Sequence, residues 1–515
     1  MISLQIFERK ISNIFSHTKI LLPAILISSF LVKLYYSPFE LPITADAFAY
    51  FGFAIDASVL KDYPNKLIGN DGWPFFLSFF FSLLPSNNFM DFMNLQRLVS
   101  ISLSVITIIP IYFISKKFLN SPYPLIAALI FAFEPRIIEN SVLGITESLY
   151  ILLGALVLWS FLTNDIKKNY LAFLFAAFFM TVRTEGIFLF FAISIIFFLK
   201  NKNEINTIKQ YLISFSVFLA ILIPILLIRV ENIGSNLVFD KIGIHGTDLI
   251  VSTTSNDIEK NYLIDGIVNF TKFLGWDLLP IFIFCAPIGL VIILKNRNWN
   301  NLTILITTLI LSIPIFYVYS SGVQDSRYFY VLYPMFSIFF IIGLQRIIGN
   351  SKREHSILLI TGILIIIGSL VFVDSRKINF DYENDVMQFT EVVFEKTHVI
   401  NQYWPESRYV VISTLSNLES FPTIIYDLEY KPKFIYEKTD TLDEYIKLGK
   451  EKGLTHLIVD DNFNPTHRMQ FLTDIYENEN NYPFLIKEYD SNQISSLYHV
   501  KIFKIDYKIY ENFNK

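Results

Sequence analysis

The stretch Leu98–Asn140, LVSISLSVITIIPIYFISKKFLNSPYPLIAALIFAFEPRIIEN, contains the pattern that decides the fold. Its first apolar run ends at Lys116 and Lys117 and is long enough to cross a bilayer core of roughly 30 Å, which needs about 20 residues. A second apolar run then ends at Glu134 and Arg136. Apolar spans that alternate between a basic loop and an acidic turn indicate a multi-pass membrane protein whose basic loops lie in the cytoplasm.

The same alternation extends over most of the chain. Paired basic residues occupy the loops at Arg9/Lys10/Lys19, Lys116/Lys117, Lys167/Lys168, Lys200/Lys202/Lys209, Lys295/Arg297 and Arg346/Lys352/Arg353. We expect helices over residues 20–36, 95–115, 121–134, 142–162, 169–182, 185–199, 210–229, 273–294, 302–320, 328–347 and 355–373. The apolar run Trp73–Pro85 is too short to span, and we expect it to rest at the membrane interface. These eleven crossings place every basic loop inside and the C-terminus outside.

The composition agrees with a membrane protein and excludes several other classes. Hydrophobic residues make up 53% and charged residues 17% of 515 residues, and the mean hydropathy is +0.46. The net charge of -4, without a basic tail, disfavours nucleic acid as a partner. The single cysteine, Cys285, excludes internal disulfides and thiolate metal sites. No spaced metal-ligand cluster or glycine-rich nucleotide loop occurs, so we expect neither a metal nor a cofactor.

The change in composition after Val373 predicts two domains. Residues 1–374 form an all-α membrane bundle of about 11 helices, with a first outer loop at 37–94 and a long outer loop at 230–272. Residues 375–515 form a small soluble α/β domain outside the membrane. Its expected strands are 409–414, 423–427, 456–460 and 499–505, and its expected helix, 441–452, is closed by Gly453.

Ionisable residues gather in the outer turns. They are Asp46, Glu134, Arg136, Glu139, Glu147, Arg183, Glu185, Asp325 and Arg327. Because charge at membrane depth is energetically costly, such residues indicate a functional site. The alternative is that they only anchor helix ends. Asp46 would then be a capping or loop acid, Arg183 and Glu185 a local ion pair, and Arg327 an interfacial anchor.

Several motifs occur in order on this predicted outer face. They are TADAFAY at 44–50, GWPFFL at 72–77, FEPR at 133–136, LGITESLY at 143–150, TVRTEG at 181–186, and Arg327-Tyr328 six residues ahead of Pro334. Together they resemble integral membrane glycosyltransferases of the GT-C type, in particular dolichyl-phosphate-mannose protein mannosyltransferases. The resemblance covers residues 20–200 and 320–345. Many relatives carry a second carboxylate where this chain has Ala47, so a mechanism with two adjacent acids is disfavoured.

The resemblance implies an enzyme that transfers mannose or another hexose from a polyprenyl-phosphate or dolichyl-phosphate carrier to a protein, glycan or lipid acceptor. Such an enzyme needs a base and phosphate-binding cations at one edge of the bilayer. Asp46 is the expected general base for an inverting transfer, and Arg183, Arg327 and Arg136 are the candidates for phosphate. The full set of expected substrate-binding residues is Tyr50, Glu134, Arg136, Glu147, Arg183, Glu185, Arg327 and Tyr328.

Two other functions remain open at this point. An oligosaccharyltransferase or a glycan ligase or polymerase shares the predicted architecture, although the outer domain has only Tyr403-Trp404 in place of a Trp-Trp-Asp motif. A secondary transporter would place its charges near the bilayer midplane and show two repeated halves. Here the charges crowd one edge. We therefore expect a multi-pass protein of the cell membrane with an extracytoplasmic active site.

Overall fold

The computed structural model contains two compact units. It describes residues 8, 11–13, 15, 17–43, 45–61, 70–86, 88–163, 165–201, 206–233, 262–349, 351–376, 380–401, 433–435, 439–461, 469–494 and 496–513. Unit 1 comprises Met1–Ser37, Ala49–Leu83 and Leu95–Arg376, and unit 2 comprises Pro38–Phe48, Leu84–Asn94 and Lys377–Lys515. Each unit has its own core and is described separately below.

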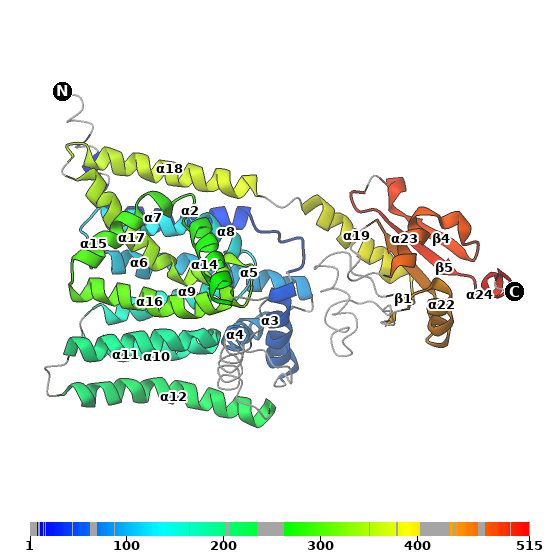
Figure 1. Cartoon of the computed structure of the whole chain (residues 1–515), viewed down its shortest axis with the longest axis horizontal. Helices are drawn as coiled ribbons and strands as arrows, with labels where there is room; N and C mark the ends of the chain where they lie inside the picture. The colour runs from blue at the N-terminus through cyan, green and yellow to red at the C-terminus, as the bar shows by residue number, and fades with distance from the viewer. Residues whose placement is uncertain are drawn as a thin grey trace. The chain divides into compact units, whose positions relative to one another are not determined.

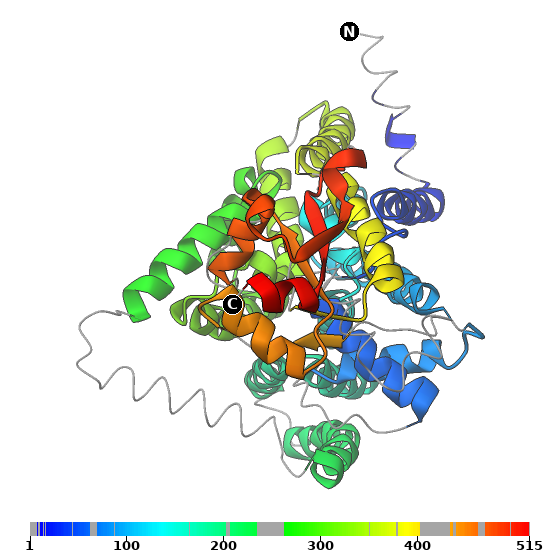
Figure 2. The same ribbon diagram turned by 90° about the vertical axis from the view of Figure 1, so that its right-hand side faces the viewer.

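Unit 1 is a helical bundle whose longer helices run side by side in Figure 1 and are seen end-on in Figure 2. Its α-helices are α2 (Thr18–Tyr35), α4 (Gly72–Phe81), α5 (Phe89–Ile106, which starts in unit 2), α6 (Ile108–Ser115), α7 (Tyr123–Ala132), α8 (Pro135–Ser141), α9 (Glu147–Phe161), α10 (Ile166–Val182), α11 (Ile187–Asn201), α12 (Thr207–Ile233), α14 (Tyr262–Leu278), α15 (Ala286–Lys295), α16 (Trp299–Ser320), α17 (Tyr333–Ile348) and α18 (Glu354–Ser375). Helix α3 (Ala45–Ile55) begins in unit 2, ends in unit 1 and continues into the π-helix η1 (Asp56–Leu60). Short 3-10 helices are η2 (Thr184–Gly186), η3 (Phe282–Phe284) and η4 (Ser326–Leu332).

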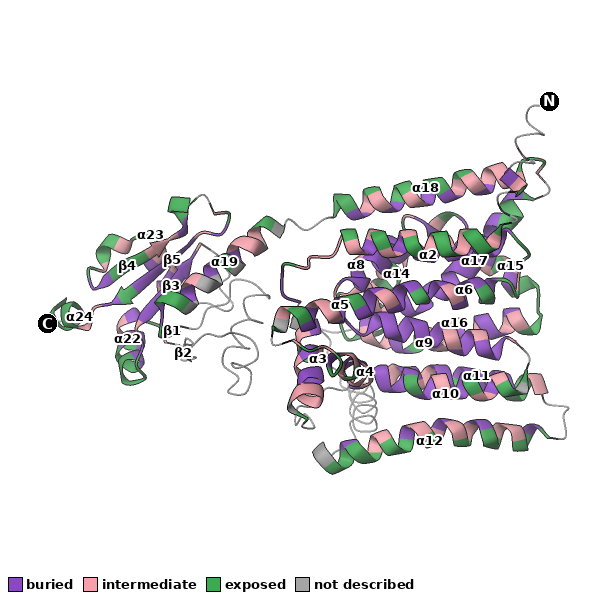
Figure 3. Ribbon diagram, turned by 180° about the vertical axis from the view of Figure 1, so that it is seen from behind, coloured by how far each residue is buried: buried purple, intermediate pink, exposed green. Residues whose placement is uncertain are grey.

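The lengths and composition of these helices identify an integral membrane protein. Among the described residues, 7 helical segments are long and apolar enough to cross a membrane. In the apolar 18-residue window of Thr207–Glu231 only 17% of the residues are buried, whereas in that of Ser326–Ile348 83% are buried. Figure 3 shows the same contrast between the exposed surface of α12 and the buried α9 and α17. Apolar helices that remain exposed in the protein require lipid around them, which agrees with a rim of membrane-facing helices.

Two hydrogen bonds join segments that are distant in sequence at one end of the bundle. Asn300 Nδ2, in the first turn of α16, donates to the carbonyl oxygen of Lys117 at 3.3 Å. Glu8 accepts a hydrogen bond from the backbone N–H of His355 at 2.7 Å at this same end. The acidic turns meet at the opposite end of the helices, as described for the site below.

One predicted helix is wrong. Residues 273–294 do not form a single crossing, because the chain breaks between α14 and α15 at Leu279–Cys285 and forms only the short helix η3 there. The amphipathic α14 runs crosswise to the bundle in Figures 1 and 2. Mean hydropathy cannot detect this break because both sides of it are apolar. Each of the other predicted helices overlaps an observed one, and the ends differ by a few residues.

Helices α15 and α17 approach each other closely through two glycines. A Cβ atom added to Gly289 would overlap the carbonyl oxygen of Phe339, and one added to Gly343 would overlap that of Cys285. Small residues allow such close backbone contact between membrane helices. Helix α17 directly follows η4, the segment that carries Arg327 and Tyr328.

Unit 2 contains a five-stranded mixed sheet in the order β2-β1-β3-β5-β4. Its elements are α19 (Phe380–Lys396), β1 (Val399–Asn401), β2 (Lys433–Ile435), α22 (Leu442–Glu451), β3 (His456–Asp460), α23 (Gln470–Glu477), β4 (Leu485–Asp490), β5 (Val500–Ile505) and α24 (Tyr507–Phe513). Strand β1 is parallel to β2 and β3, whereas β5 is antiparallel to β3 and β4. Ile458 packs with α19 on one face, and Leu457 and Val459 pack with α22 and α23 on the other.

The sequence pattern identified part of this sheet. The expected strand 456–460 coincides with β3, the expected strand 499–505 with β5, and the expected helix 441–452 with α22. Gly453 follows α22 with a φ of 81°, the left-handed conformation expected after a helix end. The expected strands 409–414 and 423–427 lie outside the described residues.

We expect Gly343→Ala to lower the melting temperature of the purified protein in detergent. The added methyl group would overlap a backbone carbonyl of α15, and overpacking of this kind costs about 1–3 kcal/mol. Gly368→Ala is the matched control, because nothing lies within 4 Å of the added atom on α18. Equal melting temperatures for the two variants would contradict the close contact.

Candidate active site

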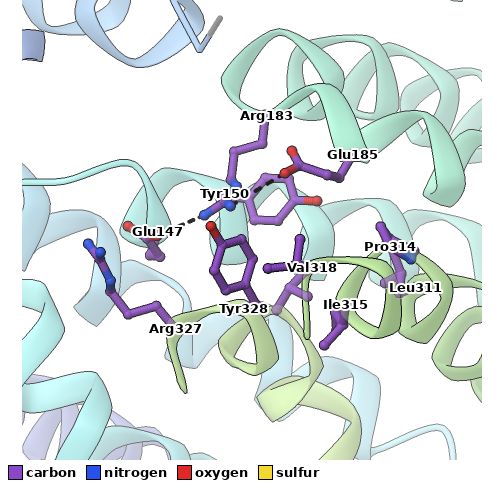
Figure 4. A pocket seen from close by; sticks show the side chains of 11 residues that line it. Glu147, Tyr150, Arg183, Glu185, Leu311, Pro314, Ile315, Val318, Arg327 and Tyr328 are labelled. Atoms are coloured by element: carbon purple, nitrogen blue, oxygen red, sulfur yellow. Dashed lines mark hydrogen bonds and ion pairs between the residues drawn. The ribbon is translucent and has the colours of Figure 1, made fainter. Parts of the chain in front are cut away.

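A pocket at the acidic end of unit 1 gathers residues from four separate segments of the chain. Its cavity volume is about 20 Å³. Figure 4 shows its lining side chains, which are Glu147, Tyr150, Arg183, Glu185, Leu311, Pro314, Ile315, Val318, Arg327, Tyr328 and Val331. The predicted residues Glu147, Arg183, Glu185, Arg327 and Tyr328 therefore converge in one place.

Arg183 is the centre of the polar part of the pocket. Its guanidinium group lies 2.8 Å from a carboxylate oxygen of Glu147 and 3.5 Å from one of Glu185, as the dashed lines in Figure 4 indicate. The rings of Tyr150 and Tyr328 lie 5.7 and 5.1 Å from the guanidinium carbon, within the range of cation–π attraction. Two carboxylates around one guanidinium leave this cluster with a net negative charge.

Local backbone geometry explains why these groups meet. Arg183 ends α10 in an extended conformation and is followed by the single turn η2. Gly186 makes this turn possible, because a Cβ atom there would lie 2.8 Å from the backbone of Met180. Glu147 is the first residue of α9, where the helix dipole favours a negative charge. Tyr150 is held one turn later by stacking on Phe179, with ring centroids 3.9 Å apart.

The other side of the pocket is apolar. Leu311, Pro314, Ile315 and Val318 lie on one face of α16, at the spacing of successive helical turns. The pocket thus combines charged groups at one end with a hydrocarbon wall beside them. This combination suits a ligand that has a charged head and an apolar tail.

Arg327 differs from Arg183 in its exposure. Its Nε atom lies 2.6 Å from a carboxylate oxygen of Asp325, which also accepts from the backbone N–H of Arg327 at 2.9 Å. The side chain of Arg327 is 31% exposed, compared with 12% for that of Arg183. Arg327 is therefore the more accessible of the two guanidinium groups in the pocket.

Glu134 and Arg136 do not line this pocket. They form a separate buried cluster in which Arg136 lies 3.2 Å from both Glu134 and Asp277. Arg136 also donates to the carbonyl oxygens of Trp276 and Leu279, each at 2.5 Å. Glu134 caps α8 by accepting from the N–H of Ile137. Both side chains are fully buried, so this geometry favours a structural role that joins α8 to the end of α14.

Asp46 and Tyr50 lie on α3 and are also not among the residues that line the pocket. Asp46 is exposed in the first turn of this helix and belongs to unit 2, whereas Tyr50 is partly buried and belongs to unit 1. The rest of α3 packs on α4 through edge-to-face contacts of Phe51 with Phe81 and of Phe53 with Phe75.

Sequence reasoning missed three ionisable residues that organise this end of unit 1. Asp277 completes the cluster around Arg136, and its carboxylate accepts from the hydroxyl of Tyr333 at 3.1 Å. Asp71 and Arg229 form a buried ion pair that joins the start of α4 to α12. The isolated arginine near the end of a long apolar segment was the signal for this pair. No group of three or more potential metal ligands occurs among the described residues.

Comparisons with known proteins show which proteins this chain resembles. Residues 72–228 match the family model described as dolichyl-phosphate-mannose-protein mannosyltransferase. The apo oligosaccharyltransferase of Archaeoglobus fulgidus aligns with a TM-score of 0.54 at 10% identity, over 85% of this chain and 69% of that one. ArnT from Cupriavidus metallidurans bound to undecaprenyl phosphate aligns with a TM-score of 0.53 at 10% identity, over 94% of this chain and 97% of that one. No curated protein sequence matches.

These findings confirm the predicted fold class. The shared fold is that of the GT-C glycosyltransferases, a helical membrane bundle followed by a smaller domain that contains a sheet. The family match covers the segments that carry Glu147 and Arg183. The resemblance to GT-C glycosyltransferases and the enzyme class, glycosyltransferase, are therefore both supported by independent comparisons.

We expect Glu147→Gln to destabilise the protein more than Glu185→Gln. The Glu147 side chain is 6% exposed and lies 2.8 Å from Arg183, and removing one partner of a buried pair costs about 3–5 kcal/mol. Glu185 is 32% exposed and lies 3.5 Å from Arg183, and pairs of this kind contribute about 1 kcal/mol or less. Melting temperatures in detergent test this order, and a reversed order would remove Glu147 as the main partner of Arg183.

Proposed function

We propose that this protein transfers a hexose such as mannose from a polyprenyl-phosphate or dolichyl-phosphate carrier to a protein, glycan or lipid acceptor on the extracytoplasmic face of the cell membrane. The observation that carries the proposal is the pocket that is lined both by Arg327, Arg183 and Glu147 and by the apolar wall of α16. A lipid-linked sugar has a phosphosugar head and an isoprenoid tail, which match the two sides of this pocket.

The structures with the same fold support a carrier of this kind. One is ArnT, which binds undecaprenyl phosphate, and another is the oligosaccharyltransferase AglB from Archaeoglobus fulgidus in complex with an inhibitory peptide and a dolichol-phosphate, with a TM-score of 0.50 at 11% identity, over 86% of this chain and 69% of that one. The predicted positions of the basic loops support the orientation. Lys117 contacts the start of α16, the end of this helix away from the pocket, and basic loops remain in the cytoplasm.

The residues of the pocket have different roles in the proposed transfer. Arg327, the more exposed guanidinium, contacts the phosphate and stabilises the charge that it gains when the bond to the anomeric carbon breaks. Arg183, already balanced by Glu147 and Glu185, holds these two carboxylates in place for the sugar hydroxyls. The ring of Tyr328 lies against the guanidinium group of Arg183.

The general base of the proposal is Asp46. The acceptor hydroxyl attacks the anomeric carbon, its proton passes to this carboxylate, and the lipid phosphate leaves from the opposite face of the sugar. A single displacement inverts the anomeric configuration. Asp46 is exposed in the first turn of α3.

We expect Asp46→Asn to abolish transfer and to retain donor binding. A general base contributes about 100-fold to 10,000-fold to a rate, and an amide cannot take the proton. The assay uses purified protein in lipid nanodiscs with radiolabelled dolichyl-phosphate mannose or glucose and a panel of acceptors: a Ser/Thr peptide, a lipid-linked glycan and a lipid. Glu40→Gln, another exposed acid of the first outer loop, is the matched control. Transfer by Asp46→Asn at a near-normal rate would remove Asp46 from this role.

The same assay tests the function itself. Transfer of a single labelled hexose to any of these acceptors supports the proposal. Transfer of a whole oligosaccharide to an Asn-containing peptide would instead identify an oligosaccharyltransferase. Uptake of a labelled solute into proteoliposomes without any transfer would identify a transporter.

We expect Arg327→Gln to raise the Kd for dolichyl phosphate about tenfold or more. Hydrogen bonds to charged groups contribute about 1.5–3 kcal/mol, and the glutamine side chain has no positive charge. Thermophoresis of the purified protein in nanodiscs measures this binding. Arg376→Gln is the control, because Arg376 is 43% exposed, pairs with Glu139 and does not line the pocket. Equal weakening by the two variants would contradict the assignment of Arg327.

A further inference from the structure

The start of α4 contacts the chain just before Glu147. Trp73 is fully buried, and its indole N–H donates to the carbonyl oxygen of Gly144 at 3.2 Å. The side-chain amide of Gln96 donates to the same oxygen at 2.7 Å. Gly144 has a φ of 74°, a conformation that glycine adopts without strain. Two donors therefore fix one carbonyl group three residues ahead of Glu147.

The same turn of α4 also contacts the chain just before Arg183. A Cβ atom at Gly72 would lie 2.6 Å from the hydroxyl oxygen of Thr181 and 2.7 Å from the backbone nitrogen of Val182. The glycine thus allows the start of α4 to touch the last turn of α10. One short segment, Gly72–Trp73, lies against both backbones whose side chains pair in the pocket.

A buried ion pair fixes this segment in turn. Asp71 immediately precedes Gly72, and its carboxylate pairs with the guanidinium group of Arg229 on α12. Both residues are 2% exposed, so the pair is shielded from water and its rupture would be costly. The start of α4 is therefore anchored to α12 while it contacts the ends of α9 and α10.

We propose that Trp73 is a positioning residue for the pocket, which sets the orientation of Glu147 against Arg183 through its indole N–H and the carbonyl group of Gly144. This inference rests on the proposed function. Trp73 does not line the pocket, so it acts on the bound sugar only through the pair. A phenylalanine at this position fills most of the same space but has no N–H to donate.

The test begins with Trp73→Phe in the transfer assay. We expect kcat to fall about tenfold and KM for the donor to change by less than about twofold, because the binding groups remain but lose their alignment. Trp299→Phe is the matched control, since Trp299 is 42% exposed and begins α16 at the basic end of the bundle. Gln96→Leu removes the second donor to the same carbonyl group and should reproduce the loss of kcat, also if Trp73→Phe does not fold. Normal kcat in both Trp73→Phe and Gln96→Leu would overturn the proposal.

A double-mutant cycle separates positioning from general packing. In the Glu147→Gln background we expect Trp73→Phe to change kcat by less than about twofold, because the residue through which it acts is already altered. A further tenfold loss in that background would overturn the proposal. The cycle is repeated with melting temperatures, which require no substrate. If the wild-type protein transfers no sugar, the proposed function fails, and this second cycle alone decides: coupled shifts support the positioning of Glu147 by Trp73, and additive shifts exclude it.

Discussion

The desolvation of a guanidinium group at the end of a membrane bundle governs the arrangement of unit 1. Removing an ion from water costs several kcal/mol, roughly, unless opposite charges and hydrogen bonds replace the lost hydration. At Arg183 this compensation comes from Glu147 and Glu185, with the rings of Tyr150 and Tyr328 on its flanks. Because these partners belong to α9, η2 and η4, three segments that are distant in sequence must meet before the arginine is tolerated.

Arg136 and Arg229, which are fully buried, obey the same rule with a different outcome. Arg136 is enclosed by Glu134, Asp277 and two carbonyl groups, and Arg229 is paired with Asp71. Neither cluster lines the pocket around Arg183. Ion pairs therefore join helices at Arg136 and Arg229, whereas the ion pairs of Arg183 line a pocket.

This distinction limits what the sequence could predict. Glu147, Arg183, Glu185, Arg327 and Tyr328 stand at helix ends, whose side of the membrane follows from the alternation of loops, and the structure brings them together. The same reasoning included Glu134 and Arg136, because it assigns a turn to a face but cannot tell whether a side chain points into a pocket or toward a neighbouring helix. Asp277 was missed because its partner lies 141 residues away along the chain, and no periodic pattern records such a pairing. The hydropathy pattern also failed to predict the break before α15, because apolar residues flank this break on both sides.

The backbone contact at Gly289 and Gly343 limits where the tail of the proposed carrier lipid can enter the helix bundle. A carrier lipid diffuses laterally, and its chain can enter a bundle only where two helices leave a hydrocarbon-sized gap. The backbones of α15 and α17 are in contact at Gly289 and Gly343. An isoprenoid chain therefore cannot pass between these two helices at that point. For the proposed lipid carrier, we infer that the tail enters beside the exposed apolar flank of α16, which carries Leu309 and Ile313 next to the pocket wall.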